Sequence, residues 1–251
     1  MSIGSAEHAA HDSQLTTHDL NQRVATAHGI LGRLGLADYM GHASARLAGT
    51  DPPAIITKPR HSTRIRGMTR LQPEQMITVD LDGGLLEGAD PPAKEVQIHT
   101  AIYRARPDVG GVVHTHQTLA TIFGVVGRPI LPLLHVEAPL VARGVPIYPS
   151  PELIDTPELG DAVARVLADL PVCHLQGHGI VAVGATVEEA TIRAIHLERL
   201  ARANLLAAQL GTPRVIPPDE IARLAGPMVG TDVRWAYYAS LLEDDAPLAG
   251  W

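Results

Sequence analysis

The chain has 251 residues and a mass of 26.7 kDa, with 45% hydrophobic and 19% charged residues. This balance predicts one globular domain with a sizeable core and argues against disorder or a repeat array. The 20 Lys and Arg against 27 Asp and Glu give a formal charge of −7, which disfavours a nucleic acid as the main partner.

Cysteine usage and apolar patterning indicate the compartment. The one cysteine, Cys173, cannot form an intramolecular disulfide, which favours a reducing cytoplasm. The N-terminal residues show no apolar signal core, and no stretch approaches the roughly 20 apolar residues of a membrane-spanning helix. We therefore expect a soluble, cytoplasmic protein. Aromatic residues are only 3% of the chain but histidine occurs 13 times, so the histidines are the first candidates for chemistry.

The first part of the chain predicts a helix followed by short strands. Residues 1–13 are polar and are predicted to be disordered. Thr16, Thr17 and Asp19 predict a helix start, and the helix is expected to end near Gly35. Its apolar residues recur at spacings of three and four and so share one face: Leu20, Val24, Ala27, Leu31 and Leu34. β-Rich runs predict four strands, at residues 41–47, 54–57, 76–81 and 85–87, with a turn at 82–84.

The later part alternates strands and helices. Hydrophobic periodicity and turn residues predict a helix at 93–106, a strand at 110–114, a helix at 118–125, and strands at 172–175 and 180–183 around a tight turn. Thr186 and Glu189 predict a capping box for a long helix that ends at Gly211. The tail carries an aromatic cluster at 234–238, which predicts core packing, a subunit contact or a cover for a site.

Three histidines and a glutamate form the strongest chemical pattern. His114 and His116 are two apart on a predicted strand, so their side chains project from the same side and can share one cation. Glu95 and His99 are four apart on the preceding predicted helix, and His178 lies in a Gly-His-Gly turn. Three histidines with an open coordination position indicate a catalytic metal site, because structural zinc sites close with four protein ligands.

The order and spacing of four motifs resemble the class II aldolase/adducin superfamily, typified by fuculose-phosphate aldolase and ribulose-phosphate 4-epimerase. The matching stretches, between about Leu20 and Gly211, are Gly41-His42-Ala43-Ser44-Ala45-Arg46, Ala93-Lys94-Glu95 with His99, His114-Thr115-His116, and Gly177-His178-Gly179 followed by Glu188-Glu189-Ala190. The resemblance implies that His114, His116 and His178 are metal ligands and that Glu95 is the acid/base.

The same resemblance implies the architecture and the assembly. It implies a three-layer α/β/α fold with a mainly antiparallel central sheet, whereas alternating strands and helices alone leave a parallel sheet open. Residues 14–211 then form the catalytic domain, and residues 212–251 a helical extension. The implied assembly is a homotetramer with its active sites at subunit interfaces. His99 is expected to orient Glu95 or another group of the site, and Ser44 and Arg46 to secure their strand.

Departures from the family pattern bear on the substrate. The residues that cradle a sugar phosphate in the aldolases are replaced here by His42, by Thr57-Lys58-Pro59-Arg60, and by Ala93-Lys94. Residues 58–70 carry several basic side chains and no Asp or Glu. A solvated basic loop is one interpretation. The interpretation we favour is that at least one of Arg60, Arg64 and Arg66 clamps a substrate carboxylate, which His42 also contacts.

These departures are similar to a branch of decarboxylases that act on hydroxylated aromatic dicarboxylates, such as 3-hydroxy-2-methylpyridine-4,5-dicarboxylate and 3,4-dihydroxyphthalate. The resemblance implies non-oxidative decarboxylation with one divalent ion per subunit: zinc, manganese, cobalt or iron. His135 is then expected to act in the neighbouring subunit's site as a proton donor or substrate contact, with a hydrogen-bonded core histidine as the alternative. Three other functions stay open: an aldolase or epimerase, an iron oxygenase, and a non-catalytic adducin-like domain.

Overall fold

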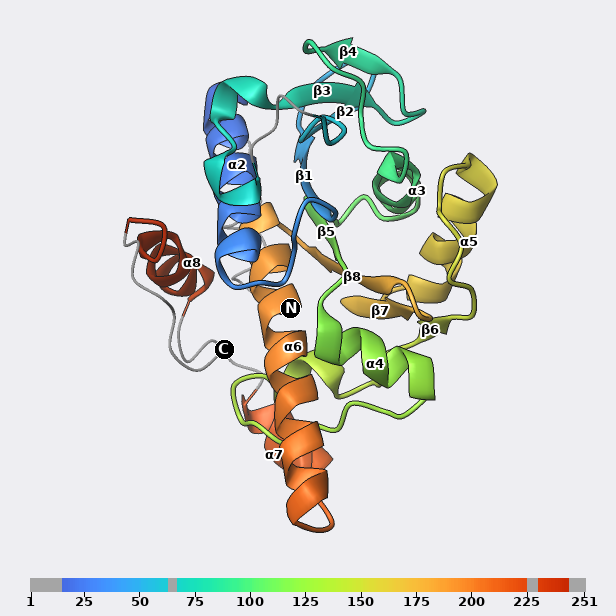
Figure 1. Ribbon diagram of the computed structural model, residues 1–251, viewed down its shortest axis with the longest axis vertical. Coiled ribbons are helices and arrows are strands. Elements are labelled where there is room, and N and C mark those ends of the chain that lie inside the picture. Colours follow the sequence, from blue (N-terminus) through green and yellow to red (C-terminus); the bar gives the residue numbers. More distant parts are fainter. Residues whose placement is uncertain (1–14, 63–66, 225–229, 244–251) are drawn as a thin grey trace.

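A computed structural model describes residues 15–62, 67–224 and 230–243 (Figure 1). Its centre is one eight-stranded sheet with the order β4-β3-β2-β1-β5-β8-β7-β6. The strands are β1 (His42–Leu47), β2 (Ala54–Thr57), β3 (Ile77–Asp80), β4 (Leu85–Glu87), β5 (Gly111–Thr115), β6 (Ile147–Tyr148), β7 (Val172–Leu175) and β8 (Gly179–Gly184). All neighbouring strands pair antiparallel except β6 and β7. The predicted, mainly antiparallel sheet is thus confirmed.

The described helices are α2 (Thr17–Arg33), α3 (Val96–Ala105), α4 (Thr118–Val126), α5 (Pro157–Leu167), α6 (Val187–Leu210), α7 (Pro218–Leu224) and α8 (Thr231–Ser240). Three short 3-10 helices also occur: η1 (Met68–Arg70), η2 (Pro73–Gln75) and η3 (Ala138–Val141). No helix in these ranges is both long and apolar enough to cross a membrane.

Most predicted elements are confirmed, and the differences lie at their ends. The capping box of Thr16 and Asp19 is present. At the start of α6, Thr186 accepts a hydrogen bond from the Glu189 amide, but the Glu189 carboxylate accepts from the Ala185 amide, so only half of the predicted box forms. The helix expected from residue 93 begins at Val96, which makes Glu95 its N-cap residue. The expectation for residues 1–13 falls outside the described residues.

Two elements, α5 and β6, were not expected from the sequence. The start of α5 does carry a recognisable signal, since the Thr156 side chain accepts a hydrogen bond from the Leu159 amide and Pro157 takes the first helical position. Strand β6 has only two residues, which is too short for any periodicity to show.

Side chains of the central strands alternate between two hydrophobic cores. Val113 and Ala182 belong to the core that contains the buried residues of α2 and α6, whereas Val112 and Val181 belong to the core of α3 and α5. Helix α6 contacts β5, β8, α2, α4 and α8. It is therefore enclosed on several sides, which explains why many of its residues are buried.

The segment after α6 adds two helices. Helix α8 packs against α6 and α2 (Figure 1). Tyr238, from the predicted aromatic cluster, is buried in the α2/α6 core. Part of this cluster therefore has a packing role within the chain.

Candidate metal centre

The sheet brings His114, His116 and His178 together. His114 lies on β5, His116 directly follows that strand, and His178 lies in the turn between β7 and β8. Because β8 pairs with β5, with Val181 opposite His114, this turn reaches the end of β5. The three ring centroids are 5.0 Å apart in each pair, and the Nε2 atoms of His114 and His116 are 3.1 Å apart.

Glu95 completes the group from the start of α3. Its Oε1 lies 3.2 Å from His178 Nε2, and its Oε2 lies 3.7 Å from His114 Nε2. The backbone amide of Ile154 donates to Oε1 at 3.3 Å and helps to hold the carboxylate in place. One ligand atom from each of the four residues lies within 4.8 Å of the others, so the group could hold one metal ion. We call these four residues the histidine–glutamate cluster.

Protonation in the cluster favours a cation. Burial lowers the pKa of His114 to about 3, so its ring is neutral. Its Nδ1 donates to the Ile180 carbonyl oxygen at 2.9 Å, which leaves a lone pair on Nε2. Burial alone would raise the pKa of Glu95, but the hydrogen bond from His178 and the nearby imidazoles lower it to about 2. Imidazole nitrogens around one carboxylate are a donor set that suits zinc, manganese, cobalt or iron.

His42 lies beside the cluster. Its ring centroid is 5.1 Å from that of His114, and its Nε2 is 4.0 Å from Glu95 Oε2. Its Nδ1 is 2.6 Å from His99 Nε2. A hydrogen bond thus links His99 to His42, and the expected role of His99 in orienting Glu95 or another group of the site stays a prediction. The sequence placed Glu95 and His99 on one helical face, but Glu95 caps α3 and turns towards the cluster.

Lys58 is buried near His42, which the sequence analysis did not anticipate. It follows β2 directly and is only 2% exposed. Burial lowers the pKa of its ammonium group to about 8. No carboxylate of the described residues lies within 4.0 Å of it, and its charge contributes to lowering the pKa values of His42 and His28. The fold thus buries a cation without supplying an anion for it.

Of the other predicted substrate-binding arginines, the structure describes only Arg60. Arg60 is exposed, and Arg64 and Arg66 lie outside the described residues. Arg46 secures its strand as expected, because its guanidinium donates to the carbonyl oxygens of Val109, Tyr103 and Arg106.

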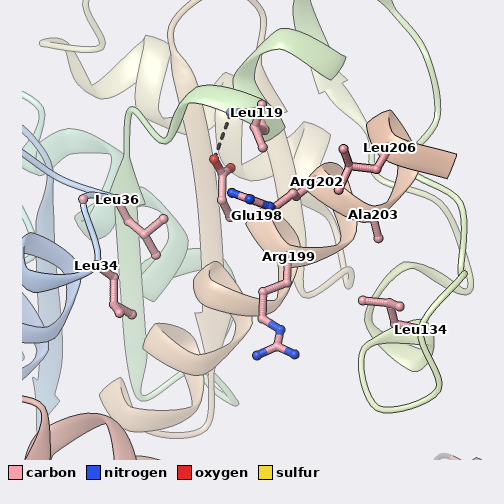
Figure 2. A pocket seen from close by; sticks show the side chains of 10 residues that line it. Leu34, Leu36, Leu119, Leu134, Glu198, Arg199, Arg202, Ala203 and Leu206 are labelled. Carbon is pink, nitrogen blue, oxygen red and sulfur yellow. Dashed lines mark hydrogen bonds between the residues drawn. The ribbon is translucent and has the colours of Figure 1, made fainter. Parts of the chain in front are cut away.

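His135 is exposed and lines a surface hollow together with Arg199 and Tyr238. A neighbouring hollow lies between α6 and the starts of α4 and the η3 loop (Figure 2). There Glu198 accepts hydrogen bonds from the amides of Leu119 and Ala120 and so caps α4. Neither hollow includes a residue of the histidine–glutamate cluster.

Comparison with known proteins defines the family. The model of the class II aldolase and adducin N-terminal domain matches residues 22–205, so the chain belongs to the class II aldolase/adducin family. The chain is 31% identical to a 3,4-dihydroxyphthalate decarboxylase of Arthrobacter keyseri, over 90% of this chain and 94% of that protein. It is 30% identical to a 5-methylthioribulose-1-phosphate/5-deoxyribulose-1-phosphate aldolase of Rhodospirillum rubrum, over 61% of this chain and 69% of that protein.

The solved structures agree with this assignment of the fold. An L-fuculose 1-phosphate aldolase from Glaciozyma antarctica PI12 superposes with a TM-score of 0.77 at 22% identity, covering 94% of this chain and 95% of that one. The resemblance inferred from the motifs is therefore confirmed.

Proposed function

We propose that this protein is a divalent-metal-dependent, non-oxidative decarboxylase of a hydroxylated aromatic or pyridine dicarboxylate. One observation carries the proposal: a group that could hold a cation occurs together with a buried Lys58 that no described carboxylate pairs with, in a chain similar over 90% of its length to a 3,4-dihydroxyphthalate decarboxylase. A dicarboxylate offers one anionic group to each of these two sites.

In this proposal His114, His116 and His178 hold the ion, and Glu95 faces it. The bound ion acts as a Lewis acid that stabilises negative charge on the substrate oxygens. Glu95, which its low pKa keeps anionic, accepts the proton of the substrate hydroxyl. The electrons of the breaking carbon–carboxylate bond pass into the ring as carbon dioxide leaves. Glu95 then returns its proton to the ring carbon, so the reaction consumes one proton overall.

Two further side chains bind the substrate. Lys58 pairs with the carboxylate that is retained, and His42 contacts an anionic oxygen beside the ion. At least one of Arg60, Arg64 and Arg66 keeps the predicted role of clamping a substrate carboxylate. His135 keeps its predicted role in a neighbouring subunit's site.

The proposal includes the assembly. We propose a cytoplasmic homotetramer whose subunits have three layers, with residues 14–211 as the catalytic domain and residues 212–251 as the extension. The two cores fed by alternate strand residues support the layers. Exposed apolar residues of α4 support burial at a subunit interface: Ile122 (49% exposed), Val125 (51%) and Val126 (58%).

A second candidate is an aldolase or epimerase. The 30% identity to the Rhodospirillum rubrum aldolase favours it. Ala93 and Lys94, which stand where sugar-phosphate members of the family carry two serines, argue against a phosphorylated substrate.

The test is carbon dioxide release under anaerobic conditions from a panel of hydroxylated phthalates and pyridine dicarboxylates. Protein is stripped of metal and reloaded with zinc, manganese, cobalt or iron(II). We expect release that requires a metal and falls at least about a thousandfold in His114→Ala, since an oxyanion-stabilising group is worth roughly two to three orders of magnitude and a lost ligand removes the whole ion. The exposed His18→Ala is the matched control.

Other outcomes contradict the proposal. Cleavage of sugar or keto-acid substrates without carbon dioxide release would establish the aldolase candidate. Turnover seen only with iron in air would establish an oxygenase.

A further inference from the structure

Four buried polar side chains form one continuous hydrogen-bonded chain behind the histidine–glutamate cluster. His42 Nδ1 lies 2.6 Å from His99 Nε2, and His99 Nδ1 lies 2.6 Å from Ser44 Oγ. Ser44 Oγ lies 2.9 Å from the Tyr103 hydroxyl. None of the four residues is more than 4% exposed. We call His42, His99, Ser44 and Tyr103 the relay chain.

Each link of the relay chain needs one donor and one acceptor. Because His42 Nδ1 and His99 Nε2 lie 2.6 Å apart, one of these nitrogens carries a hydrogen and the other does not. The burial of both rings disfavours an additional, charged proton on either. Each neutral imidazole carries one N–H, and each hydroxyl carries one hydrogen. The proton on one member therefore determines the proton position on the next.

Two arrangements satisfy every link. In the inward-donating arrangement, Tyr103 donates to Ser44, Ser44 to His99 Nδ1, and His99 Nε2 to His42 Nδ1, so His42 carries its hydrogen on Nε2. In the reverse arrangement, His42 Nδ1 donates to His99, His99 to Ser44, and Ser44 to Tyr103. The Tyr103 hydroxyl then donates to the Ser44 carbonyl oxygen 3.0 Å away. In that case His42 Nε2 has only a lone pair.

The two hydrogen-bonding arrangements differ at His42 Nε2, the end of the relay chain nearest Glu95. His42 Nε2 has no hydrogen-bond partner within the described residues, and the atom that faces it is Glu95 Oε2 at 4.0 Å. A lone pair at Nε2 would point towards a negative carboxylate, whereas an N–H would be attracted to it. The carboxylate therefore favours the inward-donating arrangement.

We propose that Ser44 and His99 are positioning residues that hold His42 as a neutral hydrogen-bond donor at Nε2, directed at an anionic oxygen of the substrate. The position of the proton on His42 is inferred from the distances within the relay chain and from the neighbouring Glu95 carboxylate. The substrate oxygen as the acceptor rests on the proposed function. A neutral donor of this kind binds a carboxylate or phenolate oxygen and offers nothing to a group that must itself donate.

The relay chain was not evident from the sequence. Ser44 was expected only to secure its strand, and Tyr103 was not singled out. His42 and Ser44 lie on one side of β1 because they are two residues apart, and His99 and Tyr103 lie on one side of α3 because they are four apart. The packing of α3 against this side of the sheet brings the two pairs together.

The test is the tautomer of His42 in the full-length, zinc-loaded protein. Magic-angle-spinning ¹⁵N NMR of histidine-labelled protein distinguishes protonated from bare ring nitrogens, and a His42→Gln spectrum assigns the signals among the 13 histidines. We expect a protonated Nε2 and a bare Nδ1 on His42. A protonated Nδ1 would overturn the proposal.

Two variants show whether the relay chain sets this tautomer. Ser44→Ala removes the donor to His99, so we expect the Nε2–H signal of His42 to fall by about half as the second tautomer appears. In Tyr103→Phe the Ser44 hydroxyl still donates to His99, so the wild-type tautomer is expected. An unchanged tautomer in Ser44→Ala would show that Glu95 alone fixes the proton and that Ser44 is merely structural. If Ser44→Ala does not fold, an altered tautomer in the near-isosteric Tyr103→Phe overturns the assigned direction.

A binding measurement tests the functional consequence separately. Calorimetric titration with phthalate as the probe is expected to show about twofold weaker binding to Ser44→Ala than to wild type, because only the Nε2–H tautomer of His42 donates and its share falls by about half. Equal affinity with a changed tautomer would contradict the contact with the substrate. A failure of the decarboxylase assay leaves the NMR result intact, so the two proposals can fail independently.

Discussion

The two sides of the candidate site are built in different ways. One side, which we call the floor, consists of the histidine–glutamate cluster. The positions of its histidines are determined by the pairing of β5 with β8 and by the tight turn before β8. The other side, which we call the rim, consists of Lys58 and Arg60 after the end of β2. Only Pro59 separates the buried cation from the exposed one. Side chains on paired strands are fixed by register, whereas those beyond a strand end depend on the packing of the segment that follows.

The charges of the two sides also differ. The floor places an anionic Glu95 beside the neutral ring of His114. A cation would complete this arrangement. The rim holds the buried ammonium group of Lys58, which no described carboxylate reaches. An anion would complete this arrangement. A cation site next to an unpaired cation fits a ligand with two negative groups better than a neutral sugar.

The floor is expected to be the less tolerant side, and Gly179→Ala tests this most severely. A Cβ at Gly179 would overlap the carbonyl oxygen of Thr115 and lie 3.0 Å from the His116 ring and 3.2 Å from the His114 ring. Overpacking of this kind costs about 3 kcal/mol at the upper end of its usual range. We expect a matching loss of unfolding free energy in urea and at least tenfold weaker zinc binding.

Gly177→Ala is the matched control, since this residue lies in the same turn. The nearest atom to its Cβ is 3.7 Å away, but its φ of 69° is left-handed. We expect a loss of about 1 kcal/mol from backbone strain and unchanged zinc affinity. Equal zinc affinity in both variants would show that the floor relaxes and would remove the contrast between the two sides.

Lys58→Met is the corresponding test of the rim. Loss of a charge-assisted hydrogen bond is expected to raise KM for a dicarboxylate about thirtyfold, which corresponds to roughly 2 kcal/mol. Because the ammonium is buried and no carboxylate of residues 15–62, 67–224 and 230–243 pairs with it, its removal is also expected to raise the melting temperature. Thermal unfolding and steady-state kinetics on the same samples check both expectations.

Arg60→Met supplies the comparison two positions along the chain. Because its side chain is exposed, any carboxylate contact it makes is screened by water, and we expect KM to rise only about threefold, less than in Lys58→Met. A Lys58→Met variant that melts lower than wild type would show that Lys58 already has an anionic partner. The idea of a vacant anion site would then fail.

The same contrast explains what could be predicted from the sequence. The spacing of His114 and His116 and the Gly-His-Gly turn are local patterns, and the sheet confirms that they meet. The burial of Lys58 depends on α2 and β2, which lie far apart in the sequence and pack together. The link from His42 to Tyr103 likewise depends on how α3 lies against the sheet. No local pattern encodes either contact, because each requires the packing of distant elements.

His28 contacts β1 and lies close enough to Lys58 for the Lys58 charge to affect its pKa. Its substitution gives the smallest predicted effect on stability. Its Nδ1 donates to the Val24 carbonyl oxygen at 2.7 Å, and its Nε2 accepts from the Ala43 amide of β1 at 3.0 Å. Burial, helped by the charge of Lys58, lowers its pKa to about 3. An unfolded histidine binds its proton near pH 6.5, so between these values the unfolded state holds the additional proton. Stability from His28 is therefore complete above about pH 6.5 and is lost as the pH falls towards 3.

One proton corresponds to about 1.4 kcal/mol per pH unit, so His28→Gln is expected to reduce the slope of unfolding free energy by about that amount between roughly pH 6 and pH 4. A glutamine amide can still donate to Val24 and accept from Ala43, which separates the titration from the loss of both hydrogen bonds. Urea unfolding across this range measures the slope, with the exposed His18→Gln as the control. If the slope in His28→Gln equals that of wild type, then α2 must open in acid before the rest of the fold. The anchoring of β1 by α2 would then be weaker than these contacts indicate.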